Sequence, residues 1–310
     1  MSLSRHHWIG LYLRGVAMGA ADLVPGVSGG TIALITGIYD RFITAIASVG
    51  IDALRMVLSG KVKDAWTHVD GNFLVAVGAG ILSSVVALAS LLNWLLMNYP
   101  LPLWALFCGL ILASAIHLFY TSRIDWTGRE YGLWLTGVGV ATFIGLMQAT
   151  QLSVGPISIF FAGAIAISAM LLPGISGSFL LLIMGMYQPV ISALVNVDLA
   201  TVGLFALGCL CGLLVFSRLL KALLARAQRA TMAILYGFLL GSVIMLWPWQ
   251  QPISSVIDRH GENRIVQSVP VLPQTYEELV GEPMLWLCLL AFSLGAGLVS
   301  LLLSAGSAEH

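Results

Sequence analysis

Long apolar runs alternate with short polar connections along most of this chain. Six of these runs are close to the ~20 residues that a helix needs to span roughly 30 Å of hydrocarbon. They cover residues 72–97, 101–120, 131–149, 199–217, 230–248 and 283–303. This pattern predicts an all-α polytopic membrane protein.

Two further apolar regions, 8–46 and 156–195, are each interrupted near the middle. The interruptions read PGVSGG and PGISGS, and proline together with glycine ends or bends a helix. Each region therefore predicts a re-entrant hairpin, in which half-length helices flank the break and the chain returns to the side from which it entered.

The two interrupted regions match each other when the sequence is shifted by 148 residues. Ten identities fall between Pro25 and Ala45 without a gap, which indicates an internal repeat. They pair Pro25, Gly26, Ser28, Gly29, Leu34, Ile35, Gly37, Tyr39, Ile43 and Ala45 with Pro173, Gly174, Ser176, Gly177, Leu182, Ile183, Gly185, Tyr187, Ile191 and Ala193. Each half, 1–150 and 151–310, then holds one hairpin and three crossings. An odd number of crossings inverts the second half relative to the first, so we expect two inverted repeats.

The basic residues support this layout. With a cytoplasmic amino terminus, 12 of the 14 lysine and arginine residues fall on the cytoplasmic side, as the positive-inside rule requires. The other two, Arg259 and Arg264, lie in an external loop, 249–282, whose prolines and acidic residues predict non-helical structure. We therefore expect both termini in the cytoplasm.

Composition agrees with the hydrophobic pattern. The chain is 59% hydrophobic and 9% charged, whereas about 25% of the residues of an average soluble domain are charged. The formal net charge is zero, so no overall field recruits nucleic acid. Any electrostatic recognition must be local.

The two breaks form the candidate binding site. Backbone groups that leave a helix inside a bilayer cost several kcal/mol each unless they meet water or other protein groups, so the breaks should meet near the midplane. Helix amino termini after the breaks present N–H donors and partial positive charge, which favour an anion. The candidate residues at the breaks are Pro25, Gly26, Ser28, Gly29, Gly30, Thr31, Gly174, Ser176, Gly177 and Ser178.

Two charged residues, Arg14 and Asp22, share the first hairpin with its break. A charge in an apolar hairpin is costly and is a functional candidate by default. The two residues are eight positions apart, a little over two helical turns, so they lie on roughly one face. We expect Arg14 to neutralise a phosphate-like group and Asp22 to orient Arg14 or carry a proton. The structural alternatives are an ion pair and an Arg14 that reaches the cytoplasmic interface.

The repeated stretches GAADLVPGVSGGTIALITGIYDRF and LLPGISGSFLLLIMGMY resemble the PopT-type family of bacterial undecaprenyl-phosphate translocases, long known only as a domain of unknown function. The resemblance covers essentially the whole chain. It implies a flippase in the bacterial cytoplasmic membrane that returns undecaprenyl phosphate from the outer to the inner leaflet, so that cell-wall peptidoglycan precursors can be built again. The implied partners are this polyprenyl phosphate and membrane lipids.

The mechanism that we expect is alternating access, with the phosphate held between the two breaks while the polyprenyl tail stays in lipid. The sequence contains no GxxxxGK[ST] motif, so ATP is not the expected driver. No cofactor is expected, and coupling to a proton or sodium gradient through Asp22 is a further hypothesis.

Two other functions stay open at this point. The architecture is similar to that of BacA-type undecaprenyl-pyrophosphate phosphatases, whose pattern places paired glutamates before the first break. Here RGVAMGAADLVPG contains no glutamate, and AGAIAISAMLLPG has no ionisable residue. Because hydrolysis needs a base and a nucleophile held together, the sequence favours a translocase over an enzyme. A small-anion carrier is the other alternative, and the oligomeric state is unknown.

Overall fold

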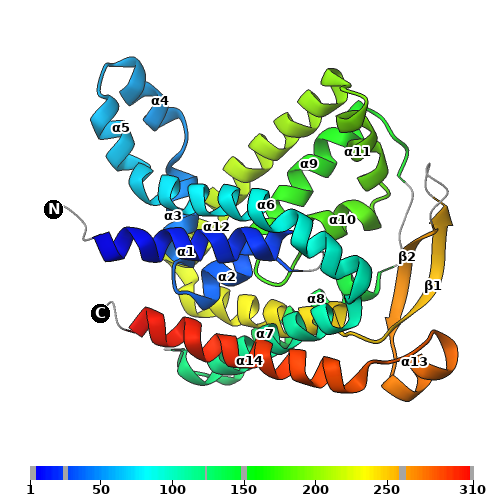
Figure 1. Ribbon diagram of the computed structural model, residues 1–310. Coiled ribbons are helices and arrows are strands. Elements are labelled where there is room, and N and C mark those ends of the chain that lie inside the picture. Colours follow the sequence, from blue (N-terminus) through cyan, green and yellow to red (C-terminus); the bar gives the residue numbers. More distant parts are fainter. Residues whose placement is uncertain (1–4, 24–26, 123, 148–151, 258–262, 308–310) are drawn as a thin grey trace.

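The computed structural model describes residues 5–23, 27–122, 124–147, 152–257 and 263–307, and most of them are helical (Figure 1). The helices of the first half are α1 Arg5–Asp22, α2 Gly29–Ile35, α3 Tyr39–Ser48, α4 Ile51–Leu58, α5 Val62–His68, α6 Gly71–Asn98, α7 Pro100–Thr121 and α8 Gly128–Leu146. Those of the second half are α9 Pro156–Leu171, α10 Gly177–Ile183, α11 Tyr187–Val195, α12 Leu199–Gly241 with the 3-10 turn η1 Ser242–Leu246, α13 Pro273–Leu279 and α14 Leu285–Ser307.

Several of these helices have the length and composition of membrane spans. Within the described residues, α6, α7 and α12 with η1 are each long and apolar enough to cross a membrane, and the pair α10–α11, bent by 108°, is a fourth if it counts as one broken span. Large apolar side chains point outward from four helices, as on a surface that lies in lipid. Examples are Val86, Phe143, Val215 and Leu294. The structure therefore agrees with a polytopic membrane protein.

Helices are found at all six predicted crossings. One connection between two of these crossings differs from the prediction. Residues 218–229, expected to link two crossings, are helical, because their leucine, alanine and long basic side chains favour a helix. The chain turns instead at Ala227, whose backbone angles (φ −144°, ψ 51°) are not helical. This residue divides α12 into two arms, 199–226 and 228–241.

The predicted two-armed hairpins are wrong in one respect, because each contains three helices. A long helix, α1 or α9, leads to the break, and a short helix, α2 or α10, packs back against it. The chain then bends again at Gly37 (φ +73°) or Gly185 (φ +70°) before α3 or α11 begins. This left-handed backbone conformation is one that glycine adopts readily.

The prediction of an all-α fold needs a correction in the segment 249–282. Strands β1 Gln250–Ile257 and β2 Asn263–Pro270 form an antiparallel pair in which Gln250 faces Pro270. Isoleucine and valine recur along both strands, and these β-branched side chains favour strands. The short helix α13 follows, with Pro273 in its first turn, so this segment is not free of helix either.

The two halves have matching elements. The 148-residue shift places α2 on α10 with the same bounds and starts α11 where α3 starts, and a shift of 128 residues places the first residue of α6 on that of α12. The matching connections differ, since the first half holds α4 and α5 where the second has only residues 196–198.

Helix packing repeats in the same way. Helix α1 packs along α6, and α9 packs along α12. A Cβ atom at Gly15 would overlap the carbonyl oxygen of Val77, and a Cβ atom at Gly163 would overlap that of Phe205. These two pairs correspond under the two shifts, so one glycine-lined contact between helices occurs twice.

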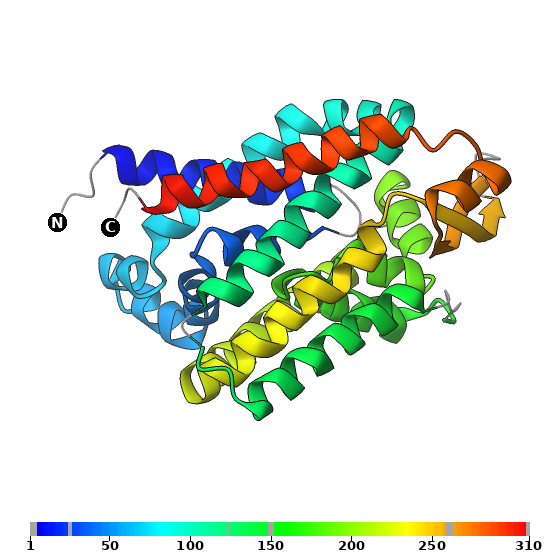
Figure 2. The ribbon, with the colours of Figure 1, turned by 90° about the horizontal axis from the view of Figure 1, so that it is seen from below.

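The two ends of the molecule are formed by different helices and strands. The start of α1, the end of α14 and the pair α4–α5 lie at one end, whereas β1, β2 and α13 lie at the other (Figures 1 and 2).

The buried hydrophobic side chains gather in separate clusters. Buried side chains of α1, α2, α3, α6, α7 and α12 form the main core. A separate buried cluster joins α9, α10, α11 and the first arm of α12.

Candidate functional site

The two breaks lie against each other, as the sequence predicted. Thr31 Oγ1 accepts a hydrogen bond from the Gly174 amide at 2.8 Å. In return, the Ser28 hydroxyl donates to the Met170 carbonyl at 2.8 Å. The Tyr39 hydroxyl donates to the neighbouring Leu171 carbonyl, also at 2.8 Å. Backbone groups freed by the second break are thus satisfied by side chains of the first.

The first break is held by its own side chains as well. Asp22, the last residue of α1, accepts a hydrogen bond from the Gly29 amide at 2.6 Å. Ser28 is the N-cap of α2, accepts from the Gly30 amide at 3.1 Å and is 1% exposed. A carboxyl group of the protein therefore already lies at the start of α2, at a helix end that favours negative charge.

The second break lacks a carboxylate of this kind. Met170 stands where Asp22 stands in the first half. Ser176 is the N-cap of α10, and its hydroxyl oxygen lies 3.0 Å from that of Ser178. A Cβ atom at Gly177 would overlap the Ala166 carbonyl oxygen, so this glycine allows α10 to lie close to α9. The start of α10 thus presents a pair of hydroxyl groups.

The other predicted residues take different positions. Arg14 is partly buried on α1, two turns before Asp22. Pro25 and Gly26 lie outside the described residues. Gly174 has φ +81°, and a Cβ atom there would come within 2.6 Å of the Phe238 carbonyl oxygen. Tyr39 was missed as a residue that joins the breaks, although its identity with Tyr187 in the repeat was a usable signal.

Polar contacts also link α3 to its neighbours at the end where α4 and α5 lie. Arg41 forms an ion pair with Asp70 at 2.7 Å and lies 4.4 Å from the centre of the Phe73 ring. Arg218 of α12 donates to the Val49 carbonyl at 3.0 Å. Arg41 thus joins α3 to α6, and Arg218 joins the end of α3 to α12.

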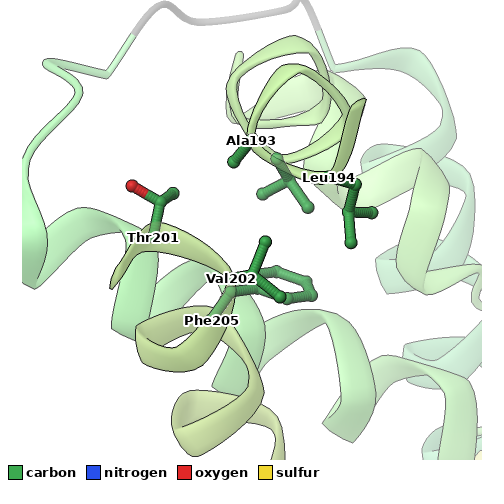
Figure 3. Close-up of a pocket in the computed structure, with 6 residues that line it drawn as sticks. Ala193, Leu194, Thr201, Val202 and Phe205 are labelled. Atoms are coloured by element: carbon green, nitrogen blue, oxygen red, sulfur yellow. The ribbon is translucent and has the colours of Figure 1, made fainter. Parts of the chain in front are cut away.

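A small pocket lies between α11 and α12, and none of its lining residues belongs to a break (Figure 3). Its lining consists of Val190, Ala193, Leu194, Thr201, Val202 and Phe205. These side chains are apolar except for Thr201, so the pocket offers no charge to an anion. Among the described residues, no cluster of three histidine, cysteine or acidic side chains could hold a metal ion.

Comparison with known proteins identifies the family. The VCA0040-like family model, described as undecaprenyl phosphate translocase-like, matches residues 18–264. The chain belongs to this translocase-like family. A polyprenyl-phosphate transporter of Vibrio cholerae serotype O1 is 39% identical over 291 residues, which cover 94% of each chain. A polyprenyl-phosphate transporter of Staphylococcus aureus is 34% identical over 263 residues, covering 79% of this chain and 88% of that protein. No solved structure matches.

The family confirms the resemblance read from the repeated motifs. Both relatives are named as transporters and neither as a phosphatase, which agrees with the expectation of a translocase rather than an enzyme. The residues that match the family model, 18–264, include α2 and α10 and therefore both breaks.

Proposed function

We propose that this chain carries undecaprenyl phosphate across the bacterial cytoplasmic membrane, from the outer to the inner leaflet, without hydrolysing it. The observation that carries the proposal is the direct bonding of the two breaks, in a chain whose relatives are named polyprenyl-phosphate transporters. Two interrupted helices that face each other inside apolar surroundings are typical of transporter binding sites.

The halves 1–150 and 151–310 act as inverted repeats in this proposal. Matching helix contacts between the halves support it. Helix α7 of the first half packs on α14 of the second, and α12 of the second half packs on α8 of the first. Gly109 meets the backbone of Phe292, and the corresponding Gly237 meets that of Trp134. A two-fold axis in the membrane plane would relate such contacts.

The phosphate group binds between the breaks. The hydroxyl groups of Ser176 and Ser178 bond each other, so one of the two protons remains available to an anion. The amides at the start of α10 add donors next to them, and Arg14 neutralises charge. The proposed site also includes Asp22, Pro25, Gly26, Ser28, Gly29, Gly30, Thr31, Gly174 and Gly177. The tail stays in the lipid that surrounds the apolar outer surface.

Transport proceeds by alternating access, with both termini in the cytoplasm. The end that bears α4 and α5 carries Arg55, Lys61 and Lys63, and basic residues favour the cytoplasmic side. One half rocks against the other, so that the site opens to each side in turn. Asp22 is the residue through which a proton or sodium gradient would act.

Two contacts favour transport over hydrolysis. The Ser28 hydroxyl donates to the Met170 carbonyl, so its proton is not aimed at a base. Asp22 accepts from the Gly29 amide and is the only acidic residue in the stretch before the first break. A nucleophile paired with a base, which phosphate ester hydrolysis requires, is not assembled by these residues.

The test uses purified protein in liposomes that contain labelled undecaprenyl phosphate. Movement of the lipid between leaflets and release of inorganic phosphate are measured for the wild type, Arg14→Ala and Arg55→Ala. Arg55 is the matched control because its side chain is 75% exposed on α4. We expect movement without phosphate release in the wild type and Arg55→Ala, and little movement in Arg14→Ala.

The other outcomes separate the alternatives. Phosphate release by the wild type would make the protein a phosphatase. Inhibition of transport by inorganic phosphate at concentrations comparable to the lipid would favour a small-anion carrier. Equal rates for Arg14→Ala and Arg55→Ala would remove Arg14 from the site.

A further inference from the structure

In the part of the chain that the structure describes, one buried hydroxyl group on α6 has no hydrogen-bond partner. Ser84 of α6 is 2% exposed, and within the described residues its Oγ meets neither a donor nor an acceptor. Its neighbour Ser83 donates to the carbonyl four residues earlier, at 2.8 Å, as serines in helices often do. A buried polar group left unpaired destabilises the folded protein and needs an explanation.

The position of Ser84 places it beside the first break. Gly15 of α1 meets Val77 of α6, and Gly19 meets Ile81, so both chains advance by four residues and the two helices run parallel. The Ser84 side chain lies against Gly19, since a Cβ atom there would come within 3.1 Å of the Ser84 Cβ. Asp22 follows Gly19 by three residues, less than one turn of α1. Ser84 is therefore on α6 at the level where α1 ends.

The comparison of the two halves sets Ser84 apart from ordinary packing residues. Under the two shifts, Ser84 corresponds to Gly212, which has no side chain and packs directly against the backbone of Ala164. Arg14 and Asp22, the two charged candidates, correspond to Ala162 and Met170. The first half thus has three polar residues along the α1–α6 contact where the second half has only apolar ones.

We propose that Ser84 is a further binding residue, whose hydroxyl group donates a hydrogen bond to the phosphate monoester group when the lipid occupies the site. The inference rests on the proposed function. It explains why the core keeps a hydroxyl group that contributes nothing to stability in the absence of a ligand. In the occupied state the anion supplies the missing acceptor, and a hydrogen bond to a charged group is stronger than one between neutral groups.

The test compares Ser84→Ala with Ser83→Ala, which removes the neighbouring hydroxyl that is already bonded. Thermal unfolding of each purified variant is followed without ligand, with undecaprenyl phosphate and with inorganic phosphate. Translocation is measured in liposomes. We expect Ser84→Ala to unfold at the same temperature as the wild type or higher without ligand, because the unpaired buried group is gone.

With undecaprenyl phosphate, we expect Ser84→Ala to bind about tenfold more weakly and to transport correspondingly less at low lipid concentration, the loss of one hydrogen bond to a charged group. Ser83→Ala should behave as the wild type. A Ser84-dependent stabilisation by inorganic phosphate as well would support the contact and show that the head group alone suffices for it.

Three results would overturn the inference. Unchanged binding and transport in a stabilised Ser84→Ala would make Ser84 an unpaired packing residue only. A lower unfolding temperature without ligand would assign the hydroxyl a structural bond. If the wild type itself neither bound nor moved undecaprenyl phosphate, the proposed function would fail first, and the inference with it.

Discussion

At the scale of single residues, the site is built by side chains that satisfy backbone groups of the opposite break. Thr31, Ser28 and Tyr39 all belong to the first half, and all bond to backbone atoms of the second. Each bond removes an unpaired N–H or C=O group from apolar surroundings, where it would be costly. The contact between the breaks is therefore a structural joint, and it is also where we propose that the ligand binds.

Thr31→Val tests the strength of this joint. The substitution keeps the shape of a side chain that is fully buried, but it removes the acceptor of the Gly174 amide. A buried amide left unpaired costs about 1–3 kcal/mol, so the unfolding temperature in detergent should fall. Thr36→Val is the control, because among the described residues the Thr36 hydroxyl bonds only the Ile32 carbonyl, which already accepts from the Thr36 amide. An equal fall in both variants would contradict the prediction.

The sequence could predict that the breaks meet, because that follows from the energy of unpaired backbone groups in lipid. It could not predict which side chains form the bonds. Ser28 and Thr31 were expected to serve a ligand, and they were found bonded across the joint. Asp22 was expected to act with Arg14, and its carboxylate accepts from the Gly29 amide. These assignments depend on distances that no local pattern encodes.

At the scale of helices, glycines define the contacts that hold the long helices together. Gly15 sits where α1 crosses the backbone of Val77, and Gly80 sits where α6 crosses that of Tyr12. Small residues allow such close approach, and the resulting van der Waals packing helps to hold helices together in lipid.

Gly15→Ala and Gly78→Ala form a matched pair for this contact. A Cβ atom at Gly15 would overlap the Val77 carbonyl, whereas one at Gly78 would have no atom within 4 Å. We expect Gly15→Ala to lower the free energy of unfolding by about 1–3 kcal/mol through overpacking. Gly78→Ala should leave this free energy unchanged or raise it, because alanine favours a helix more than glycine does. Thermal unfolding in detergent measures both. Shifts of the same sign and size would contradict the prediction and show that the contact between α1 and α6 accommodates the added methyl group.

The sequence predicted the long helices better than the short elements. Apolar length alone locates α6, α7 and α14, because lipid imposes that length. The bends at Gly37 and Gly185 were visible as matched glycines but were not interpreted as turns. The turn at Ala227 has no glycine or proline to indicate it, and the strands β1 and β2 occur in a segment for which the sequence predicted only an absence of helix. Short elements depend on tertiary contacts that a local pattern does not contain.

At the scale of the whole molecule, the two ends differ although the two halves match. At the end that bears α4 and α5, α3 packs against α12 of the other half. The corresponding pair at the opposite end is α11 and α6. In the part of the chain that the structure describes, α11 packs on α12 and α10 and makes no extensive contact with α6. The buried cluster around α11 is accordingly separate from the main core.

This difference implies a second state if the halves are inverted repeats. Exchanging the arrangements of the two halves would bring α11 against α6 and move α3 away from α12, which is the change that alternating access requires. Ser48 and Lys221 lie on the two sides of the α3–α12 contact, with the Lys221 ammonium 3.5 Å from the Ser48 hydroxyl. Linking these positions should hold the present state.

Cross-linking tests whether α3 must leave α12 during transport. Ser48→Cys and Lys221→Cys are combined in a chain whose four native cysteines, all free thiols, are replaced by alanine, and a short cleavable reagent joins the two new thiols. Because the linked chain cannot reach the second state, we expect undecaprenyl phosphate transport in liposomes to stop and to return when the link is cleaved. Each single cysteine variant, treated alike, should keep its rate. Transport at an unchanged rate with the link intact would mean that α3 stays on α12 throughout, and that the site opens on this side between other helices.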